Sequence, residues 1–144
     1  MNSTICNKLF DYKQLALNKL ASVGIEDKFT LKIKQPNSDF VAMYRSYSQY
    51  KNGGRGPIFW LAPMLLDNKP EFIISVLHEY GHVMAESAYV NNDKMFSLLR
   101  DIYPGRSYNR PWDEEEFAED FAQQVYNNSL DGNIRQLIDQ YLLE

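Results

Sequence analysis

The amino-acid sequence predicts an α+β protein in which a small mixed sheet is followed by several helices. Three patterns predict this class. Apolar residues recur with a helical period over residues 4–23, alternate with polar residues over residues 28–34 and 40–50, and return to a helical period over residues 70–88. The 144 residues suit one modest core, and no repeat or linker divides them, so we expect a single domain spanning residues 1–144.

The first elements are predicted to be a helix and two strands. The amphipathic helix of residues 4–23 is ended by Gly24. The strand of residues 28–34 places its apolar side chains on one side and a row of lysines on the other. A turn at residues 36–39 is expected to join it to the strand of residues 40–50 as a hairpin.

A short apolar strand is expected after the glycine-rich turn of residues 51–56. It follows Pro57, a position that suits an edge strand, and it comprises Ile58, Phe59, Trp60 and Leu61. The free backbone N–H and C=O groups of an edge strand can pair with an extended peptide. A simple edge strand without a binding role is the alternative interpretation.

The helix predicted over residues 70–88 contains both histidines of the chain, and Asp67 and Asn68 just before it offer an N-cap. His78 and His82 are four residues apart and therefore lie on one face of a helix. Glu79 completes the pattern H-E-x-x-H, in which two imidazoles bind a zinc ion and a carboxylate accepts a proton from water. A hydrogen-bonded core histidine is the common alternative, but here both histidines fall at ligand spacing.

Three further helices are predicted over residues 94–102, 113–128 and 134–143. A catalytic zinc ion takes three protein ligands, and in the absence of a third histidine the third should be a carboxylate. The acidic second helix of this set is the obvious source. Glu115 and Glu119 lie four residues apart, so we expect Glu115 to bind the metal and Glu119 to hydrogen-bond a histidine ring nitrogen. The alternative is that the acids at the helix start only complement the helix dipole.

The spacing of these residues resembles the gluzincin family of zinc metallopeptidases. H-E-x-x-H followed by E-x-x-x-[DE] on a later helix is the gluzincin pattern, and residues 115–121 look like the glutamate helix of the anthrax lethal factor catalytic domain and the Pro-Pro endopeptidases. Gly81, before the second histidine, also matches. The resemblance covers residues 57–128 and implies a zincin-like fold with an edge strand beside the H-E-x-x-H helix and one zinc ion per chain.

Two further points follow from resemblance. In that family a tyrosine seven residues before the metal-binding glutamate hydrogen-bonds the reacting carbonyl oxygen, and Tyr108 stands at that spacing here, with Tyr103 and Tyr80 as nearby alternatives. Residues 115–122 are also similar to the E-x-x-A-[DE]-x-F-A helix of compact phage and mobile-element peptidases that cleave repressors. The N-terminal part departs from the family, so substrate preference does not transfer.

The resemblance implies a zinc-dependent endopeptidase whose partner is a protein or peptide substrate. Glu79 would act as general base and Tyr108 would stabilise the oxyanion, while the substrate would lie along residues 58–61. The Zn²⁺ cofactor would be held by His78, His82 and Glu115. The alternative is a non-catalytic regulatory module of the same fold that binds zinc or a peptide. A third hypothesis is a regulatory protease that cleaves a repressor or a signalling protein.

Composition and charge exclude other classes. A hydrophobic fraction of 44% with 24% charged residues is typical of a folded chain. The net charge of −4 without a basic cluster argues against nucleic-acid binding. The lone Cys6 fits a reducing compartment, and the charged N-terminal stretch does not resemble a signal peptide. We therefore expect a cytoplasmic protein with no membrane partner, while unconventional export and the oligomeric state stay open.

Overall fold

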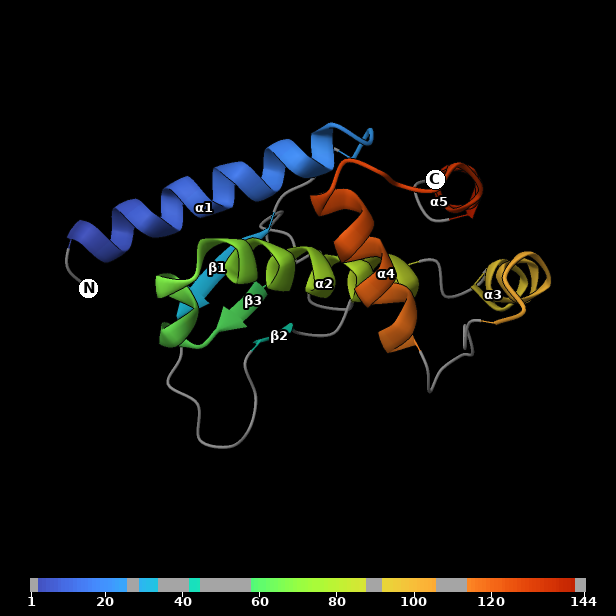
Figure 1. The fold of residues 1–144 in the computed structure, drawn as a ribbon. Helices are drawn as coiled ribbons and strands as arrows, with labels where there is room; N and C mark the ends of the chain where they lie inside the picture. The colour runs from blue at the N-terminus through green and yellow to red at the C-terminus, as the bar shows by residue number, and fades with distance from the viewer. Residues whose placement is uncertain are drawn as a thin grey trace.

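The computed structural model describes residues 3–25, 29–33, 42–44, 58–87, 92–105 and 114–141. Its elements follow one another in the order shown in Figure 1: α1 (Ser3–Ala21), β1 (Thr30–Ile33), β2 (Ala42–Tyr44), β3 (Ile58–Leu61), the 3-10 helix η3 (Pro63–Asp67), α2 (Lys69–Ser87), α3 (Asn92–Ile102), α4 (Glu114–Tyr126) and α5 (Gly132–Tyr141). The predicted α+β class is confirmed. The turns expected at residues 36–39 and 51–56 lie outside the described residues.

The described strands form a small mixed sheet in the order β1-β3-β2. β1 pairs with β3 in parallel, with Leu31 opposite Phe59, and β2 pairs with β3 antiparallel, with Met43 opposite Trp60. The predicted hairpin between the first two strands is therefore wrong, because both strands pair with β3 and not with each other. Alternation of side chains predicts that a segment is a strand, but it does not specify the neighbouring strand.

The prediction that residues 58–61 form an edge strand for substrate is also wrong. Ile58, Phe59, Trp60 and Leu61 make up β3, whose backbone is paired on both sides within the described sheet. Proline at residue 57 does not conflict with this position, since a proline is tolerated where a strand begins. Phe59 and Leu61 are fully buried, which agrees with a central strand whose apolar side chains face the core.

Helix α2 is the element around which the others pack. Of the two residues that the sequence offers as its N-cap, Asp67 and Asn68, it is Asn68 whose side-chain Oδ1 accepts a hydrogen bond from the backbone N–H of Glu71, at 3.3 Å. Its buried face contacts α1, the sheet and α4, so that α2 lies in the middle of the molecule (Figure 1). The buried side chains of this face include Phe72, Val76, Leu77, Tyr80 and Val83.

Helix α1 runs along α2 and ends in a tight glycine turn. Gly24 has a φ of +84° and donates to the Ala21 carbonyl, while the N–H of Ile25 donates to Leu20 at 3.0 Å. These two bonds are a Schellman motif, which needs a left-handed residue and therefore favours glycine. The ring of Tyr12 packs on Phe72 of α2 with centroids 5.0 Å apart, which fixes α1 over the first half of α2.

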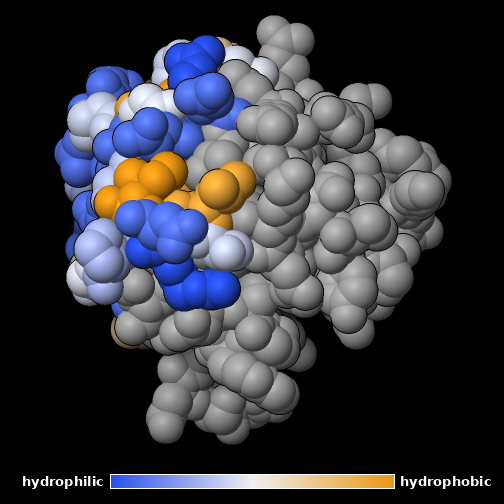
Figure 2. Space-filling model, turned by 90° about the vertical axis from the view of Figure 1, so that its right-hand side faces the viewer, coloured by the Kyte–Doolittle hydropathy of each residue, from blue (hydrophilic) through white to orange (hydrophobic). Residues whose placement is uncertain are grey.

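Helices α3 and α5 contact each other at the opposite end of the molecule from the N-terminus (Figure 1). α5 is capped by Asp131, whose Oδ1 accepts hydrogen bonds from the N–H groups of Asn133 and Ile134. On the face that Figure 2 shows, a small group of hydrophobic residues lies among hydrophilic ones. None of the helices in the described part of the chain has the length and hydropathy that crossing a membrane requires.

Candidate metal centre

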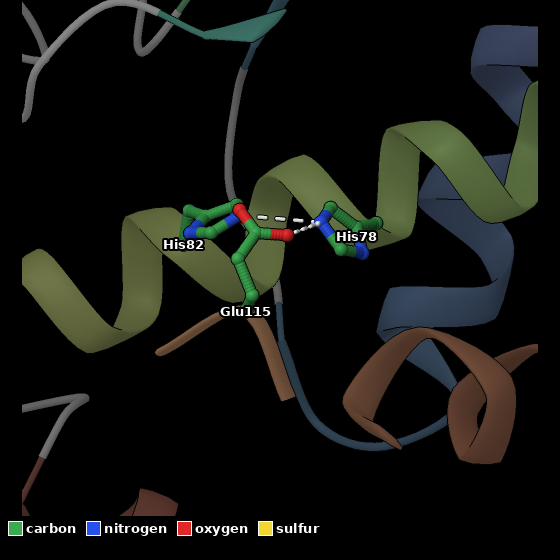
Figure 3. Close-up of side chains that lie close together, drawn as sticks. All are labelled: His78, His82 and Glu115. Carbon is green, nitrogen blue, oxygen red and sulfur yellow. Dashed lines mark hydrogen bonds and ion pairs between the residues drawn. The ribbon is translucent and has the colours of Figure 1, made fainter. Parts of the chain in front are cut away.

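Three side chains predicted as ligands converge on one point. His78 and His82 stand one turn apart on α2, and their Nε2 atoms lie 3.2 Å from each other. A carboxylate oxygen of Glu115, in the first turn of α4, lies 3.0 Å from Nε2 of His78 and the other lies 2.6 Å from Nε2 of His82. Figure 3 shows the two rings and the carboxylate pointing toward one another. One donor atom from each residue falls within 4.8 Å of the other two, a spacing that can hold a metal ion.

The chemistry of this donor set fits a tetrahedral cation. A Zn–N distance of about 2.0–2.1 Å places neighbouring ligand atoms about 3.3 Å apart, close to the spacing of the two Nε2 atoms. The side chain of Glu115 is 68% exposed, whereas both histidine side chains are largely buried. The cluster is therefore held from the protein side by two fixed imidazoles and remains accessible from the Glu115 side.

The predicted role of Glu119 agrees with the structure. Its Oε2 lies 2.9 Å from Nδ1 of His78, and, because a carboxylate can only accept, Nδ1 carries the proton. The Nε2 lone pair of a neutral His78 then faces the carboxylate of Glu115, which is favourable when a cation lies between them. Gln123, one turn further along α4, donates its amide to the other oxygen of Glu119 at 3.0 Å.

Close contact between two helices brings Glu115 to the histidines. Gly81 of α2 faces Ala118 of α4, and a Cβ added at Gly81 would lie 2.8 Å from Ala118 Cα. Ala118 and Ala122 are fully buried in this contact between small residues. The sequence signals for it are the glycine inside the motif and the two alanines, one between the two glutamates and one just after them, which permit helices to approach closely.

Glu79 is buried next to the cluster and has no hydrogen-bond or ion-pair partner among the described residues. The residue is 7% exposed, and it lines a pocket together with His78 and Glu119. Burial raises the pKa of the Glu79 carboxyl above its ordinary value of 4.5, while the charges of His82 and His78 oppose that rise. A carboxyl group with a raised pKa and no fixed partner is suited to accepting a proton.

The tyrosine expected to bind an oxyanion is not located by the structure. Tyr108 lies outside the described residues. Of the alternatives, Tyr80 is 2% exposed and packs against Phe59 in the core, which places its ring away from solvent. The hydroxyl of Tyr103 donates to the side chain of Asp131 at the start of α5. Neither alternative is therefore a good candidate for an oxyanion donor, and Tyr108 stays a prediction.

Sequence reasoning missed two features of this site. Gln123 was not identified, although its spacing of four residues from Glu119 is a signal that the two side chains meet on the helix surface. The pocket beside the cluster was also missed, because its lining comes from two helices and depends on how they pack.

No protein-family model matches this chain, and comparison with curated proteins and with solved structures found no similar protein. The functional argument therefore rests on the arrangement of His78, His82 and Glu115, with Glu79 and Glu119 beside them.

Proposed function

We propose that this protein is a zinc-dependent endopeptidase with a zincin-like fold. The observation that supports the proposal most directly is the convergence of His78, His82 and Glu115, from two helices, on a common point. Two imidazoles and one carboxylate form a ligand set that catalytic zinc sites use, with a fourth position left for water. Harder cations such as Mg²⁺ prefer oxygen ligands, so the two ring nitrogens favour zinc.

The residues around the cluster provide the groups that peptide hydrolysis needs. Zinc bound there supplies a Lewis acid that activates water and polarises a carbonyl group. Glu79, buried beside the cluster, accepts a proton from the attacking water and passes it to the nitrogen of the departing amine. The water oxygen forms the new bond to the carbonyl carbon, the peptide C–N bond breaks, and the products are a carboxylic acid and an amine.

Glu119 and Gln123 act on His78 rather than on the substrate. The bond between Glu119 and Nδ1 of His78 fixes the ring orientation and keeps Nε2 free of a proton. The amide of Gln123 holds the Glu119 carboxylate in place in turn. Tyr108 is our proposed oxyanion donor, a role worth about 3 kcal/mol to catalysis for a well-placed group.

The test combines metal analysis with peptide cleavage. The purified protein is expected to contain about one zinc per chain, to cleave members of a peptide library, and to lose cleavage on treatment with a chelator. Glu79→Gln should retain the zinc and the fold while cleavage falls by at least about a hundredfold. The matched control is Asp11→Asn on the exposed side of α1, which should cleave like the wild type.

Two outcomes would reject the proposal. Cleavage that survives in folded, zinc-loaded Glu79→Gln protein would remove the assigned base. Zinc held by a fourth side chain, with no cleavage of any peptide in the library, would favour a non-catalytic zinc-binding module instead.

A further inference from the structure

A pocket of about 280 Å³ opens beside the candidate metal centre, between the first half of α2 and the middle of α4. On α2 it is lined by one helical face, and on α4 by two residues one turn apart. The residues of the lining are Glu71, Ile74, Ser75, His78, Glu79, Glu119 and Gln123. The volume lies just under the range of about 300–1,000 Å³ typical of sites for whole small molecules, so it suits a single side chain.

The lining of the pocket is rich in acidic residues. Glu71, Glu79 and Glu119 contribute carboxylates, and none of the lining residues within the described part of the chain is a lysine or an arginine. A divalent cation bound at Glu115 would not reverse the negative charge of the site. With Glu115 added to the three glutamates of the lining, four carboxylates face two positive charges, which leaves an excess of two negative charges. Ile74 supplies an apolar surface for a hydrocarbon stem, and Ser75 and Gln123 supply polar groups.

A second observation indicates that the pocket takes a ligand. Glu79 is 7% exposed, lines the pocket, and has no hydrogen bond or ion pair to any described residue. A buried carboxylate without a partner is costly, and a donor from outside the chain would remove that cost. Glu119, by contrast, already has both oxygens engaged, by His78 and by Gln123. Glu71, in the first turn of α2, is exposed, so an incoming charge can reach its carboxylate.

We infer that this pocket selects a lysine or arginine side chain of the peptide substrate, next to the bond that is cut, and that Glu71 is its specificity-determining residue. This inference rests on the proposed peptidase function. The apolar side of Ile74 accommodates the methylene stem, and the charged end reaches the carboxylate of Glu71. An acidic side chain in the same position is disfavoured by like charge.

The first experiment measures binding without hydrolysis. N-acetyl-lysine methylamide and its norleucine counterpart, which has the same stem without the charge, are titrated into the chelator-treated ¹⁵N-labelled protein. We expect the lysine compound to shift the amide signals of Ser75 and Gln123 and to bind about fivefold more tightly than norleucine at low salt. Glu71→Gln should abolish most of that preference. Asp67→Asn, an equal change of charge just before α2 and outside the pocket, should retain it.

The second experiment measures cleavage by the zinc-loaded protein. Peptide pools that differ only in one position, set to lysine, arginine, norleucine or glutamate, should show kcat/KM about fivefold higher for the basic residues at a position flanking the cut. Glu71→Gln should remove the preference mainly through KM. Equal binding and equal cleavage of the lysine and norleucine probes would overturn the inference. Preferential lysine binding with no cleavage of any pool would instead reject the peptidase and leave the cation pocket standing.

Discussion

Gly81 lies against the backbone of Ala118 so closely that a Cβ on Gly81 would come within 2.8 Å of Ala118 Cα and 3.1 Å of its Cβ. This contact sets the distance between α2, which carries both histidines, and α4, which carries Glu115. Because the closest atom is backbone, it cannot rotate away as the end of a flexible side chain could. The position of Glu115 relative to His78 and His82 therefore depends on the absence of a side chain at residue 81.

Gly81→Ala should both destabilise the fold and weaken metal binding. The added methyl group must push α4 away from α2, and overpacking of this kind costs about 1–3 kcal/mol. Thermal unfolding and zinc titration measure the two effects. The control is Gly132→Ala at the start of α5, where an added Cβ meets nothing within 4 Å, and there alanine should be neutral or slightly stabilising. Unchanged zinc affinity in Gly81→Ala would show that the helix separation does not set the ligand geometry.

Zinc should raise the unfolding temperature of the wild type and should have little effect once a ligand is removed. At a free zinc concentration of a hundred times the dissociation constant, binding to the folded state adds about 2.7 kcal/mol. His78→Ala, His82→Ala and Glu115→Ala should each lose most of this gain, which thermal scans with zinc and with chelator would reveal. A full zinc-dependent shift in any one of these variants would remove that residue from the ligand set.

Glu119→Ala should lower zinc affinity by about 10- to 100-fold without removing a ligand, since partners of ligating histidines have effects of that size. Gln123→Ala should have a smaller effect in the same direction, about two- to tenfold, because it removes only one hydrogen bond to Glu119. Competition with a chromogenic chelator gives both affinities. Gln136→Ala on the exposed side of α5 serves as the control. A zinc affinity of Glu119→Ala equal to that of the wild type would mean that the hydrogen bond from Nδ1 of His78 to Glu119 does not orient the His78 ring for metal binding.

Glu79→Gln should make the metal-free protein more stable at neutral pH. Burial raises the pKa of Glu79 in the folded state, so the folded protein binds more protons than the unfolded one between pH 4.5 and the raised value. The free energy of unfolding of the wild type therefore falls as the pH rises through this window, and the uncharged amide avoids the loss. Urea unfolding in the presence of a chelator should give the variant and the wild type the same free energy of unfolding below pH 4.5. Above pH 4.5 the variant's free energy of unfolding should exceed that of the wild type by an amount that increases with pH. Asp11→Asn, which also removes one carboxylate but on the exposed side of α1, is the matched control.

Tyr103→Phe should lower stability at neutral pH by about 1 kcal/mol, because it removes a hydrogen bond to the cap of α5. The Tyr103 hydroxyl is the main cause that lowers the pKa of Asp131 below its ordinary value of 3.8. A lowered pKa gives stability that is present above pH 3.8 and is lost as the pH falls through the folded value. The difference between variant and wild type should therefore shrink in strong acid. Tyr126→Phe, which keeps the ring beneath Lys19, is the control.

The site could be predicted to a large extent because its signals are local. The spacing of His78 and His82 and the spacing of Glu115 and Glu119 each place two side chains on one helix face, whatever the rest of the chain does. The boundaries of α2 and α4 also follow from local patterns, so the predicted helices agree with the structure to within a few residues. The choice of Glu115 over its acidic neighbours is in line with the cluster that the structure forms.

The strand order could not be predicted in the same way. Side-chain alternation is a property of one strand, whereas a strand's neighbours are set by contacts between segments far apart in the chain. For this reason Ile58–Leu61 was predicted at the edge of the sheet and lies at its centre.

The sequence by itself determined which side chains could bind a metal ion and which helices would carry them, because helical periodicity fixes the direction of a side chain from its position alone. The tertiary structure decided how close those helices lie, through Gly81 and Ala118, and which groups surround the cluster. It alone buried Glu79 with no hydrogen-bond or ion-pair partner among the described residues, and it formed the acidic pocket from residues of two helices. These features depend on packing between distant segments, where small differences in side-chain volume determine the final separation.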